Sequence, residues 1–543
     1  MTRYKFLPYL CDFYKTTHSN QYHPDVKYIY SNFVPRMSRI QGIDHVLFFG
    51  LQGFVLDKIQ EIEDNFFALS EEVFEIKLKE YTNHIKNSLG ETAQYVDIDK
   101  YRRLYKLGYL PVEIRGLLEG SLAPIKMPLF EIYNTHPDFA WVTNFLESYI
   151  SAEMWYPITV ATFAFEYRKI IHKAYSKTVD FEIPKAMACS GNAKMFNYLT
   201  REQSGLSEFG TRGGQSMDSA IKASAAFLTC FNKSANVAAG AYIQDFYGAK
   251  DNDALGMVST EHSVMCSNFA IDGDEETFFD KLITEIYPTG NISVVADSYD
   301  YWNFIDNILP KFKTKILARN GCVGIRGDSG DVINVVVESV KKLWDIFGGI
   351  VNSKGYKVLD SHVKVIYGDS ITINRARIIY QTLEKLGFAA NNVSLGAGSF
   401  SMLCYEDTEG KLFPFTRDTF GIAIKATHCV TIDRDGNKRE IQIFKDPKSD
   451  TEGFKKSYRG RVAVIFENEK EVVIDQLDSE IPRSIERENL LRHTYFKDGV
   501  AYVKDSRWEF ITSLIDYYLE PLQIKKDFLP VEHKNNGGNY HVL

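Results

Sequence analysis

The sequence predicts an α/β protein whose core is a series of strand–helix units between residues 292 and 400. Four short apolar runs in this stretch are rich in β-branched residues, as buried parallel strands are, and each ends in a glycine or acidic turn. The runs are 292–296, 322–325, 363–367 and 393–395. Helical periodicity follows two of them, in Val336, Val340, Leu343 and Phe347 and again in Ile379, Leu383 and Leu386. Because chemistry in α/β sheets and barrels is placed at the carboxyl ends of strands, we expect the functional residues in these turns.

The chain of 543 residues is long for one domain, and its character changes on both sides of this core. We predict an N-terminal α+β segment over 1–160, a strand–helix core over 161–399 and a C-terminal β-rich segment over 400–543. The two flanking segments share the same character, so we expect them to join into one second domain.

The pattern predicts individual elements in order along the chain. Before residue 292 we expect strands at 28–33 and 46–50, helices over 55–108, strands within 111–133, a helix over 139–173 that ends or kinks at Pro157, and an Ala-rich helix over 216–230. After the core we expect a hairpin of 422–430 and 440–444 around Asp435-Gly436, strands at 461–466 and 471–474, and a helix over 508–518.

Composition argues against several classes of function. The net charge of −8 gives no electrostatic basis for nucleic-acid binding, and an anionic substrate would need a local basic pocket. No apolar run approaches the roughly 20 residues of a membrane helix, and the N-terminus leads into no signal-peptide core, so we expect a cytoplasmic protein. The seven cysteines are scattered and form no zinc-type pair, which indicates free thiols.

Ten short sequence words occur in one order along the chain. They are Asp12-Phe13-Tyr14-Lys15, Gly50-Leu51-Gln52, Trp155 to Thr162, Phe209 to Gly213, Glu261-His262-Ser263, Asp297 to Asp300, Arg326 to Gly330, Gly368-Asp369, Thr416-Arg417-Asp418 and Phe444 to Pro447. In this order they resemble the nicotinamide phosphoribosyltransferases, members of the type II phosphoribosyltransferase family, and the matches run from about residue 10 to about residue 500.

The resemblance implies an irregular β/α barrel with a second α+β domain formed from both chain ends, in a homodimer with active sites at the subunit interface. It implies transfer of a phosphoribosyl group from 5-phosphoribosyl 1-diphosphate to nicotinamide, which yields nicotinamide mononucleotide and diphosphate in NAD salvage. It also implies Mg²⁺ bound with the diphosphate and ATP as a coupled co-substrate, while no residue is assigned as a metal ligand.

The strand-end residues suit this chemistry in their own right. Breaking the bond between the sugar C1 and the diphosphate develops positive charge on the ribose, as in glycoside cleavage. Asp328 and Asp369 follow strands and suit the ribose hydroxyls and this charge, whereas Asp297 can equally be a helix N-cap. Arg326 lies two residues before Asp328, so a guanidinium and a carboxylate can reach one substrate.

The resemblance assigns roles to further residues. It places Arg212, His262 and Arg326 at the diphosphate, and it makes His262, Glu261, Asp297 and Asp328 the catalytic residues. The residues that line the mononucleotide are then Arg326, Gly327, Asp328, Gly368, Asp369, Gly398, Ser399 and Arg417.

The base site is expected around Phe209 and Arg212. Their spacing of three residues can present an aromatic face and a guanidinium together to a pyridine ring and its carboxamide. By resemblance, Tyr14 from the neighbouring subunit covers the other face of the ring, and Arg36 and Lys425 bring positive charge across the interface to the phosphate. Without the resemblance, Tyr14 would be interpreted as a packing residue.

One histidine of the twelve stands out, His262 in the word Glu261-His262-Ser263. The resemblance implies that it is phosphorylated, which couples ATP hydrolysis to the sugar transfer. Neutral imidazole is a competent nucleophile near pH 7, and an adjacent carboxylate can fix its tautomer.

The sequence departs from the family at two places. Ala235 stands where members selective for the amide carry an Asp that accepts from the carboxamide NH2, a loss of order 1–3 kcal/mol if the amide is buried. Losing this anion favours nicotinate, although Asn236 could supply another acceptor. The second departure is Ser399-Phe400, where the family has glycines, followed by an insertion around 406–412 that we expect to crowd or reshape the phosphate end.

Three functions therefore stay open. The first is a nicotinamide phosphoribosyltransferase, and the second is the same chemistry on nicotinate, favoured by Ala235. The third is a non-catalytic barrel that binds a nucleotide or a partner. The intact set of Arg326, Asp328, Asp369 and His262 argues against this third function.

Overall fold

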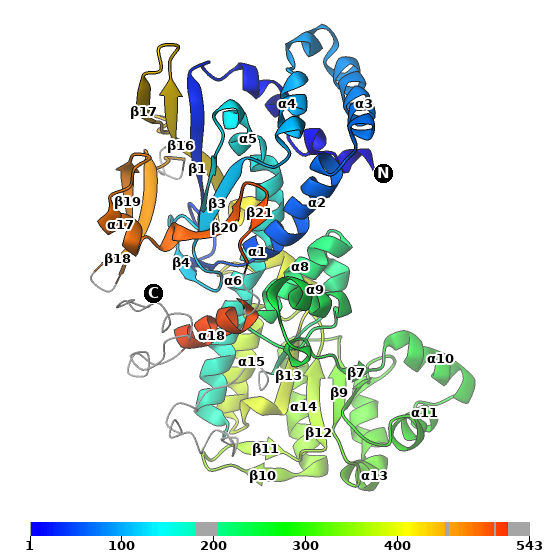
Figure 1. The fold of residues 1–543 in the computed structure, drawn as a ribbon. Coiled ribbons are helices and arrows are strands. Elements are labelled where there is room, and N and C mark those ends of the chain that lie inside the picture. The colour runs from blue at the N-terminus through cyan, green and yellow to red at the C-terminus, as the bar shows by residue number, and fades with distance from the viewer. Residues whose placement is uncertain (1, 181–204, 451–454, 468–469, 504–506, 520–543) are drawn as a thin grey trace.

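The computed structural model describes residues 2–180, 205–450, 455–467, 470–503 and 507–519. Its two large sheets lie at opposite ends of the molecule, and the long helix α6 (Glu147–Thr178) connects the two regions (Figure 1). This helix packs against β2 (His45–Leu47) of the N-terminal region and against α8 (Met217–Leu228) and α15 (Ile373–Lys385) of the core.

The lower sheet in Figure 1 contains six parallel strands within the described residues, in the order β6-β13-β12-β9-β8-β7. They are β6 (Leu206–Glu208), β7 (Val258–Ser259), β8 (Ile292–Val295), β9 (Val323–Gly327), β12 (Val363–Tyr367) and β13 (Val393–Ala397). The four predicted strand runs are β8, β9, β12 and β13. The sheet is open and forms a half-barrel, so the predicted α/β fold class is confirmed.

Helices follow the strands of this half-barrel, and α14 (Val332–Phe347) and α15 are the two that the periodicity predicted. The helices are α8, α9 (Val237–Tyr247), α10 (His262–Asp272), α11 (Glu276–Lys281), α12 (Tyr301–Asn303), α13 (Lys313–Leu317), α14, α15 and α16 (Ser399–Leu403). The two longest of these helices, α14 after β9 and α15 after β12, each begin at a side-chain N-cap. The Asp331 side chain accepts from the Asn334 N–H at 2.8 Å before α14, and Thr372 accepts from the Arg375 N–H at 3.2 Å before α15.

The upper sheet is antiparallel and draws its strands from both ends of the chain. Its seven strands within the described residues have the order β17-β16-β1-β5-β3-β20-β21. They are β1 (Val26–Val34), β3 (Val112–Gly116), β5 (Phe130–Asn134), β16 (Ala423–Ile432), β17 (Lys438–Gln442), β20 (His493–Lys497) and β21 (Val500–Ala501). N-terminal β1 thus pairs with β16 on one side and with β5 on the other. Domain boundaries at residues 160 and 399 stay a prediction.

The remaining elements flank these two sheets. The N-terminal helices are α1 (Leu51–Gly53), α2 (Gln60–Ile62), α3 (Glu71–Leu89), α4 (Asp99–Leu107) and α5 (Ala140–Phe145), and the C-terminal ones are α17 (Arg483–Glu488) and α18 (Arg507–Leu519). Two-stranded pairs are β2 with β4 (Leu122–Pro124), β10 (Gly349–Val351) with β11 (Lys357–Leu359), β14 (Cys404–Glu406) with β15 (Leu412–Pro414), and β18 (Arg461–Glu467) with β19 (Lys470–Leu477). The predicted insertion around 406–412 is therefore the turn of the β14–β15 hairpin.

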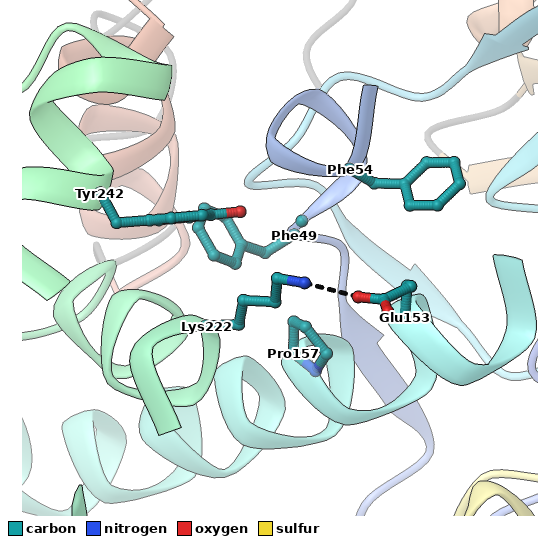
Figure 2. A pocket seen from close by; sticks show the side chains of 7 residues that line it. Phe49, Phe54, Glu153, Pro157, Lys222 and Tyr242 are labelled. Atoms are coloured by element: carbon teal, nitrogen blue, oxygen red, sulfur yellow. Dashed lines mark hydrogen bonds and ion pairs between the residues drawn. The ribbon is translucent and has the colours of Figure 1, made fainter. Parts of the chain in front are cut away.

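The helix predicted over 139–173 does not end at Pro157, because α6 runs unbroken past it. A proline removes one backbone hydrogen bond from a helix, and burial of α6 on several sides outweighs this local loss. The proline ring packs against Gly50, where an added Cβ would lie 3.2 Å from the Pro157 Cβ. Figure 2 shows this ring beside the ion pair of Lys222 and Glu153.

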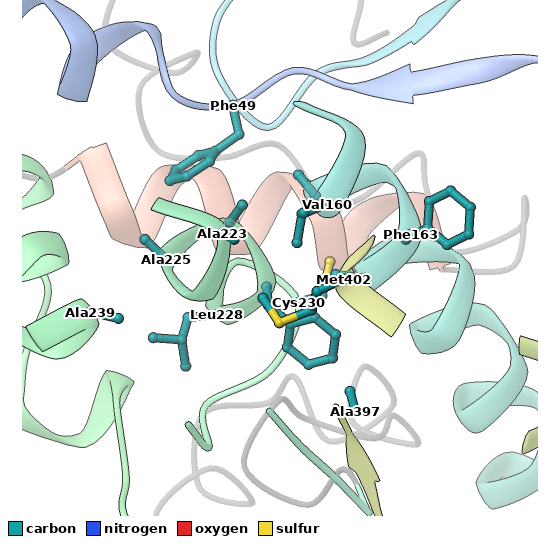
Figure 3. Close-up of a cluster of buried hydrophobic side chains, with 14 of the residues drawn as sticks. Phe49, Val160, Phe163, Ala223, Ala225, Leu228, Cys230, Ala239, Ala397 and Met402 are labelled. Atoms are coloured by element: carbon teal, nitrogen blue, oxygen red, sulfur yellow. The ribbon is translucent and has the colours of Figure 1, made fainter. Parts of the chain in front are cut away.

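An apolar core continues from α6 into the half-barrel. In Figure 3, Val160 and Phe163 project from α6, Val160 lies beside Ala223 of α8, and Ala397 and Met402 approach from the end of β13 and from α16. All five side chains are buried. The strand-end turns therefore rest on a packed layer rather than on loops alone.

None of the helices in the described ranges combines the length and apolar character that a bilayer crossing requires, and the cytoplasmic location stays a prediction. The six described cysteines are all free, whereas Cys189 lies outside the described residues.

A buried cation joins α8 to α6. The Lys222 ammonium of α8 donates to Glu153 Oε2 of α6 at 2.5 Å and to Asp218 Oδ2 at 2.9 Å (Figure 2). Its side chain is almost fully removed from solvent. Breaking a buried ion pair by removing one partner leaves an uncompensated charge, which costs more than the loss of an exposed pair.

Replacing Lys222 by Met is expected to lower the free energy of unfolding by about 3 kcal/mol, measured by urea denaturation. Lys315→Met is the matched control, because Lys315 pairs with Asp280 at 2.6 Å with both side chains exposed. We expect the control to change stability by less than about 1 kcal/mol. Equal effects of the two substitutions would contradict a special role for the buried pair.

Candidate active site

The parallel order of the strands brings four predicted residues to one edge of the half-barrel. Asp297 follows β8, Asp328 follows β9, Asp369 follows β12, and Ser399 follows β13. Because β13, β12, β9 and β8 are neighbours in this order, their carboxyl ends lie side by side.

The Asp297 carboxylate contacts three other groups at this edge of the sheet. Its Oδ2 accepts from the Asp328 N–H at 2.9 Å and from Ser329 Oγ at 2.7 Å, and its Oδ1 lies 3.1 Å from His262 Nε2. The side chain is only 3% exposed. Burial alone would raise the pKa of Asp297, but these two hydrogen bonds and the nearby imidazole outweigh it and hold the pKa below its ordinary value. The alternative N-cap role falls to Asp300, which accepts from the Asn303 N–H.

His262 is the first residue of α10, and its side chain is 49% exposed. The carboxylate in contact with the imidazole belongs to Asp297 and not to the sequence neighbour Glu261. Glu261 accepts instead from the hydroxyl of Ser263. The tautomer of an imidazole is set by the hydrogen bond of its other nitrogen, so a proton on Nε2 shared with Asp297 leaves the lone pair on Nδ1.

Arg326 and Asp328 form a bidentate ion pair. Arg326 Nε donates to Asp328 Oδ1 at 2.9 Å, and an NH2 group donates to Oδ2 at 2.6 Å. Gly368 closes over this pair, since a Cβ there would lie 2.8 Å from Arg326 Nε and still nearer to Asp328. The neighbouring Asp369 is exposed and accepts from Ser370 Oγ at 2.8 Å. The structure thus brings Arg326, Asp328, Gly368 and Asp369 together, and Gly327 lies between the first two.

A cavity of about 320 Å³ opens next to this pair. It is lined by Ser207, Phe209, Thr211, Arg212, Lys233, Ser234, Ala235, Leu255, Gly256, Met257, Ser259 and Arg326. The Arg326 guanidinium carbon lies 5.6 Å from the centre of the Phe209 ring. The ring is seated against Gly396, where a Cβ would lie 2.5 Å from it. The predicted base-site residues Phe209, Arg212 and Ala235 therefore share one cavity, which we call the base cavity.

Sequence reasoning missed two lysines of the half-barrel interior. Lys233 lines the base cavity, and burial lowers the pKa of its ammonium. Burial, together with the charge of Lys233, lowers the pKa of Lys364 on β12 to about 8. Two features of the sequence could have indicated these lysines. Lys233 directly precedes Ser234-Ala235, and Lys364 interrupts an apolar strand.

The lining residues of the base cavity carry positive charge from Arg212, Lys233 and Arg326 and include no Asp or Glu. Asn236 does not restore an acceptor there, because its Oδ1 accepts from the Ala239 N–H at 3.3 Å as the N-cap of α9. Glu208, also missed, supports the wall: its buried carboxylate accepts from the Gly210 N–H and from Ser234 Oγ. Burial raises the pKa of Glu208.

The three residues expected to act from the neighbouring subunit also lie outside the lining of the base cavity. Tyr14 is 60% exposed and donates to Asp12 at 3.3 Å, Arg36 Nε donates to the Gly421 carbonyl, and Lys425 Nζ donates to the Ile424 carbonyl. Burial and the charge of Arg417 both lower the pKa of Arg36. Burial, the charge of Arg36 and that of Arg417 likewise lower the pKa of Lys425. Arg417 therefore belongs to a cationic group with Arg36 and Lys425.

The second departure from the family lies at α16. Ser399 begins this helix and packs against Gly213, where a Cβ would lie 2.7 Å from the Ser399 Cβ. Gly398, just before it, has room beside the Gly368 carbonyl. Phe400 and the 406–410 turn line a separate cavity of about 860 Å³ that shares no lining residue with the base cavity.

Comparison with known proteins gives a consistent family. Residues 205–478 match the model of the nicotinate phosphoribosyltransferase (NAPRTase) family. A nicotinamide phosphoribosyltransferase from Acinetobacter baylyi is 34% identical over 520 residues, covering 91% of this chain and 94% of that protein. One from Xanthomonas campestris is 30% identical over 478 residues, covering 84% and 86%.

Solved structures share the fold. The crystal structure of human nicotinic acid phosphoribosyltransferase has a TM-score of 0.51 at 16% identity and covers 95% of each chain. Nicotinate-nucleotide pyrophosphorylase from Pyrococcus furiosus has a TM-score of 0.51 at 12% identity, covering 96% of this chain and 97% of that one. At such identities the likeness shows the fold alone.

Replacing Asp297 by Asn is expected to lower the free energy of unfolding at about pH 7 by about 1–3 kcal/mol, because the donors of Asp328 and Ser329 lose a charged acceptor. The pKa of Asp297 is lowered in the folded protein, so its carboxylate contributes stability above the ordinary value of 3.8 and loses it as the pH falls further. In urea denaturation, the difference between the two proteins should shrink below pH 3.8. A constant difference across the acid range would contradict this assignment.

Proposed function

This chain belongs to the nicotinate phosphoribosyltransferase (NAPRTase) family and is a pentosyltransferase of NAD biosynthesis, and we propose that it transfers the phosphoribosyl group of 5-phosphoribosyl 1-diphosphate to nicotinamide. Nicotinamide is the proposed base because relatives that align along most of the chain, among them those from Acinetobacter baylyi and Xanthomonas campestris, are named for it. The observation that carries the reaction is the Arg326–Asp328 pair, whose Arg326 lines the base cavity together with Phe209.

The proposed reaction displaces diphosphate at C1 of the ribose. The ring nitrogen of the base, stacked on Phe209, forms the new bond to C1, and the electrons of the broken C1–O bond leave on the diphosphate. Arg212 and Arg326 offer charge-assisted hydrogen bonds to this leaving group. Asp328 and Asp369 are placed for the ribose hydroxyls and for the positive charge that develops on the sugar.

We propose Mg²⁺ as the cation that accompanies the diphosphate. Magnesium prefers oxygen ligands and keeps several waters, so one or two carboxylates suffice to hold it with a substrate phosphate. Asp369 fits this need, because it is exposed and its carboxylate contacts only Ser370 Oγ among the described residues.

ATP coupling through His262 is the second part of the proposal. The half-exposed imidazole is reachable, and its contact with Asp297 supports a lone pair on Nδ1 and favours the positive charge of a phosphorylated ring. Asp297 also accepts from the Asp328 N–H, so the phosphorylatable residue and the ribose-binding strand end share one carboxylate. Phosphorylation at His262 would therefore be felt directly at Asp328.

Nicotinate is the second candidate base, and the charge of the base cavity favours it. A carboxylate would find Arg212, Lys233 and Arg326 in the wall and no acid to repel it. Among the described residues no carboxylate pairs with Lys233, so a substrate carboxylate could pair with its ammonium. The carboxamide of nicotinamide, by contrast, would face Ala235, which offers no hydrogen-bond acceptor in its side chain.

The two bases are distinguished by one assay with the purified chain, the phosphoribosyl donor and Mg²⁺, with and without ATP. We expect mononucleotide from nicotinamide, formed faster when ATP is present. Faster turnover of nicotinate would replace the first candidate by the second. No product from either base would contradict both and leave a binding function.

The same assay tests the role of charge in choosing the base. Lys233→Met is expected to reduce the ratio of kcat/KM for nicotinate over nicotinamide by about tenfold, the effect of about 1.4 kcal/mol. Ala235→Asp should shift the ratio in the same direction by adding an acceptor for the amide and an anion. Lys250→Met is the control, because Lys250 is a surface residue paired only with Glu509 at 3.5 Å among the described residues. If Lys233→Met and Lys250→Met behave alike, base choice lies elsewhere.

We further propose a homodimer with shared active sites. The base cavity has one aromatic face, Phe209, while the exposed Tyr14 and the cationic group of Arg36, Arg417 and Lys425 lie outside its lining. The charge of Arg417 acts on Tyr14 as well as on Arg36, so these residues form one surface. Supplied by a second copy, this surface would provide the missing ring face and positive charge for the phosphate.

Mixing inactive Tyr14→Ala and Asp328→Asn proteins tests this arrangement. Random exchange in equal amounts makes half of the dimers hybrid, each with one intact site, so about a quarter of wild-type activity should return. The control mixes Asp328→Asn with Phe209→Ala, two residues that one chain supplies to the same site, and should show no rescue. Absence of rescue in the first mixture would argue against a shared site.

A further inference from the structure

A second cavity lies in the antiparallel region, away from the carboxyl ends of the parallel strands. It has a volume of about 470 Å³, and its wall comes from β1, β5, β16, β17 and β18. The lining residues are Tyr28, Ile29, Tyr30, Tyr133, Asn134, Thr135, His428, Val430, Ile432, Lys438, Arg461 and Ser479. None of them has a part in the phosphoribosyl chemistry proposed above.

Three metal-binding side chains meet at the edge of this cavity. His428 Nε2 lies 2.8 Å from Glu440 Oε2 and 4.0 Å from Asp478 Oδ1, and the three donor atoms lie within 4.8 Å of one another. Within the described part of the chain, this is the one group of three such residues that could hold a metal ion.

The strand register builds this group. In the antiparallel pair of β16 and β17, His428 stands opposite Gln442 and Val430 stands opposite Glu440, so His428 and Glu440 are diagonal neighbours on one face. The end of β19 is tied to β17 by two hydrogen bonds, from Gln442 Nε2 to the Gln476 carbonyl at 2.8 Å and from Ser479 Oγ to Glu440 Oε2 at 2.7 Å. Asp478 lies between these two attachment points.

His428 carries a second, independent sign of an ion. Its side chain is 2% exposed, and its Nε2 makes no well-aligned hydrogen bond in the described structure although Glu440 Oε2 is 2.8 Å away. A buried nitrogen and a carboxylate this close need a proton or a metal ion between them, and the poor hydrogen-bond alignment favours the metal ion. A cation bound by both atoms would satisfy this need.

We propose that His428, Glu440 and Asp478 bind a divalent transition-metal ion of the zinc class. One imidazole and two carboxylates suit such an ion, with metal–ligand distances of about 2.0–2.2 Å. In tetrahedral coordination these distances separate neighbouring ligand atoms by about 3.3–3.6 Å. The observed 2.8 and 4.0 Å lie on either side of this range. Asp478 is 57% exposed, so its carboxylate is free to turn toward the ion.

The surrounding charges are compatible with this ion. Lys438 Nζ binds Glu440 Oε1 at 2.8 Å, which orients the carboxylate and leaves Oε2 for Ser479 and the metal. The guanidinium of Arg461 is engaged by Glu131 at 3.0 Å.

A metal at this position would cross-link β16, β17 and the turn after β19, with its remaining coordination sites facing the 470 Å³ cavity. Water from the cavity can fill those sites and gives the ion a path of entry.

Cobalt titration of the chelator-treated full chain tests the proposal, because Co²⁺ reports its ligands by visible absorption. We expect one saturable Co²⁺ per wild-type chain that Zn²⁺ displaces. Asp478→Asn should weaken this binding at least tenfold, and His428→Gln should abolish it. His45→Gln is the matched control: its two ring nitrogens face Asp44 and Glu166 separately, each at 3.0 Å, so it should leave the titration unchanged.

Circular dichroism of each variant verifies its fold, and the exposed Asp478 keeps the test decisive if His428→Gln fails to fold. Wild-type protein that binds no Co²⁺, or an Asp478→Asn protein that binds as tightly as wild type, would overturn the proposal. Ions held by the strand-end carboxylates of the other sheet would persist in both variants. No outcome depends on the transferase reaction.

Discussion

The interaction on which the strand-end site depends is the set of contacts made by the Asp297 carboxylate. One oxygen holds the backbone and side chain at the start of the turn after β9, and the other contacts the first residue of α10. The carboxylate is nearly buried, so these contacts are formed in a region of low dielectric and are stronger than they would be in water. Any movement of β8 would be passed to His262 and to Asp328 together.

Close packing adds a second constraint around this carboxylate. Gly368 leaves room for the Arg326–Asp328 pair, and Gly396 leaves room for the Phe209 ring, so two neighbouring strands each carry a position where a side chain cannot fit. The guanidinium and the aromatic ring are thereby held in place before any substrate arrives, and little ordering remains to be done on binding. Lys233 lines the same cavity as this guanidinium and this ring, and its charge acts on Lys364 of β12.

Much of the half-barrel could be predicted from sequence because its signals are local. The apolar runs gave β8, β9, β12 and β13, and the glycine and acidic residues after them marked the correct edge. The partner of His262 could not be found in this way, because Asp297 is remote in sequence while Glu261 is adjacent. The helix end predicted at Pro157 is wrong for a related reason, because tertiary burial outweighs the local helix-breaking effect of a proline. His428, Glu440 and Asp478 have no motif spacing, since strand register and a hairpin bring them together.

The strand order of the antiparallel sheet has a consequence for folding during synthesis. The register of β1 pairs residue 26 with residue 431 of β16. One edge of this N-terminal strand therefore stays uncovered until β16 has been synthesised. Contacts of such long sequence separation close slowly, and an uncovered strand edge can pair with other chains. The parallel sheet also has a long-range pairing, of residue 206 with residue 395, but all of its strands lie between residues 206 and 397 and precede β16 in the chain. Synthesis from the N-terminus would therefore complete the catalytic layer first, and a chain truncated before β16 would carry an open edge prone to aggregation.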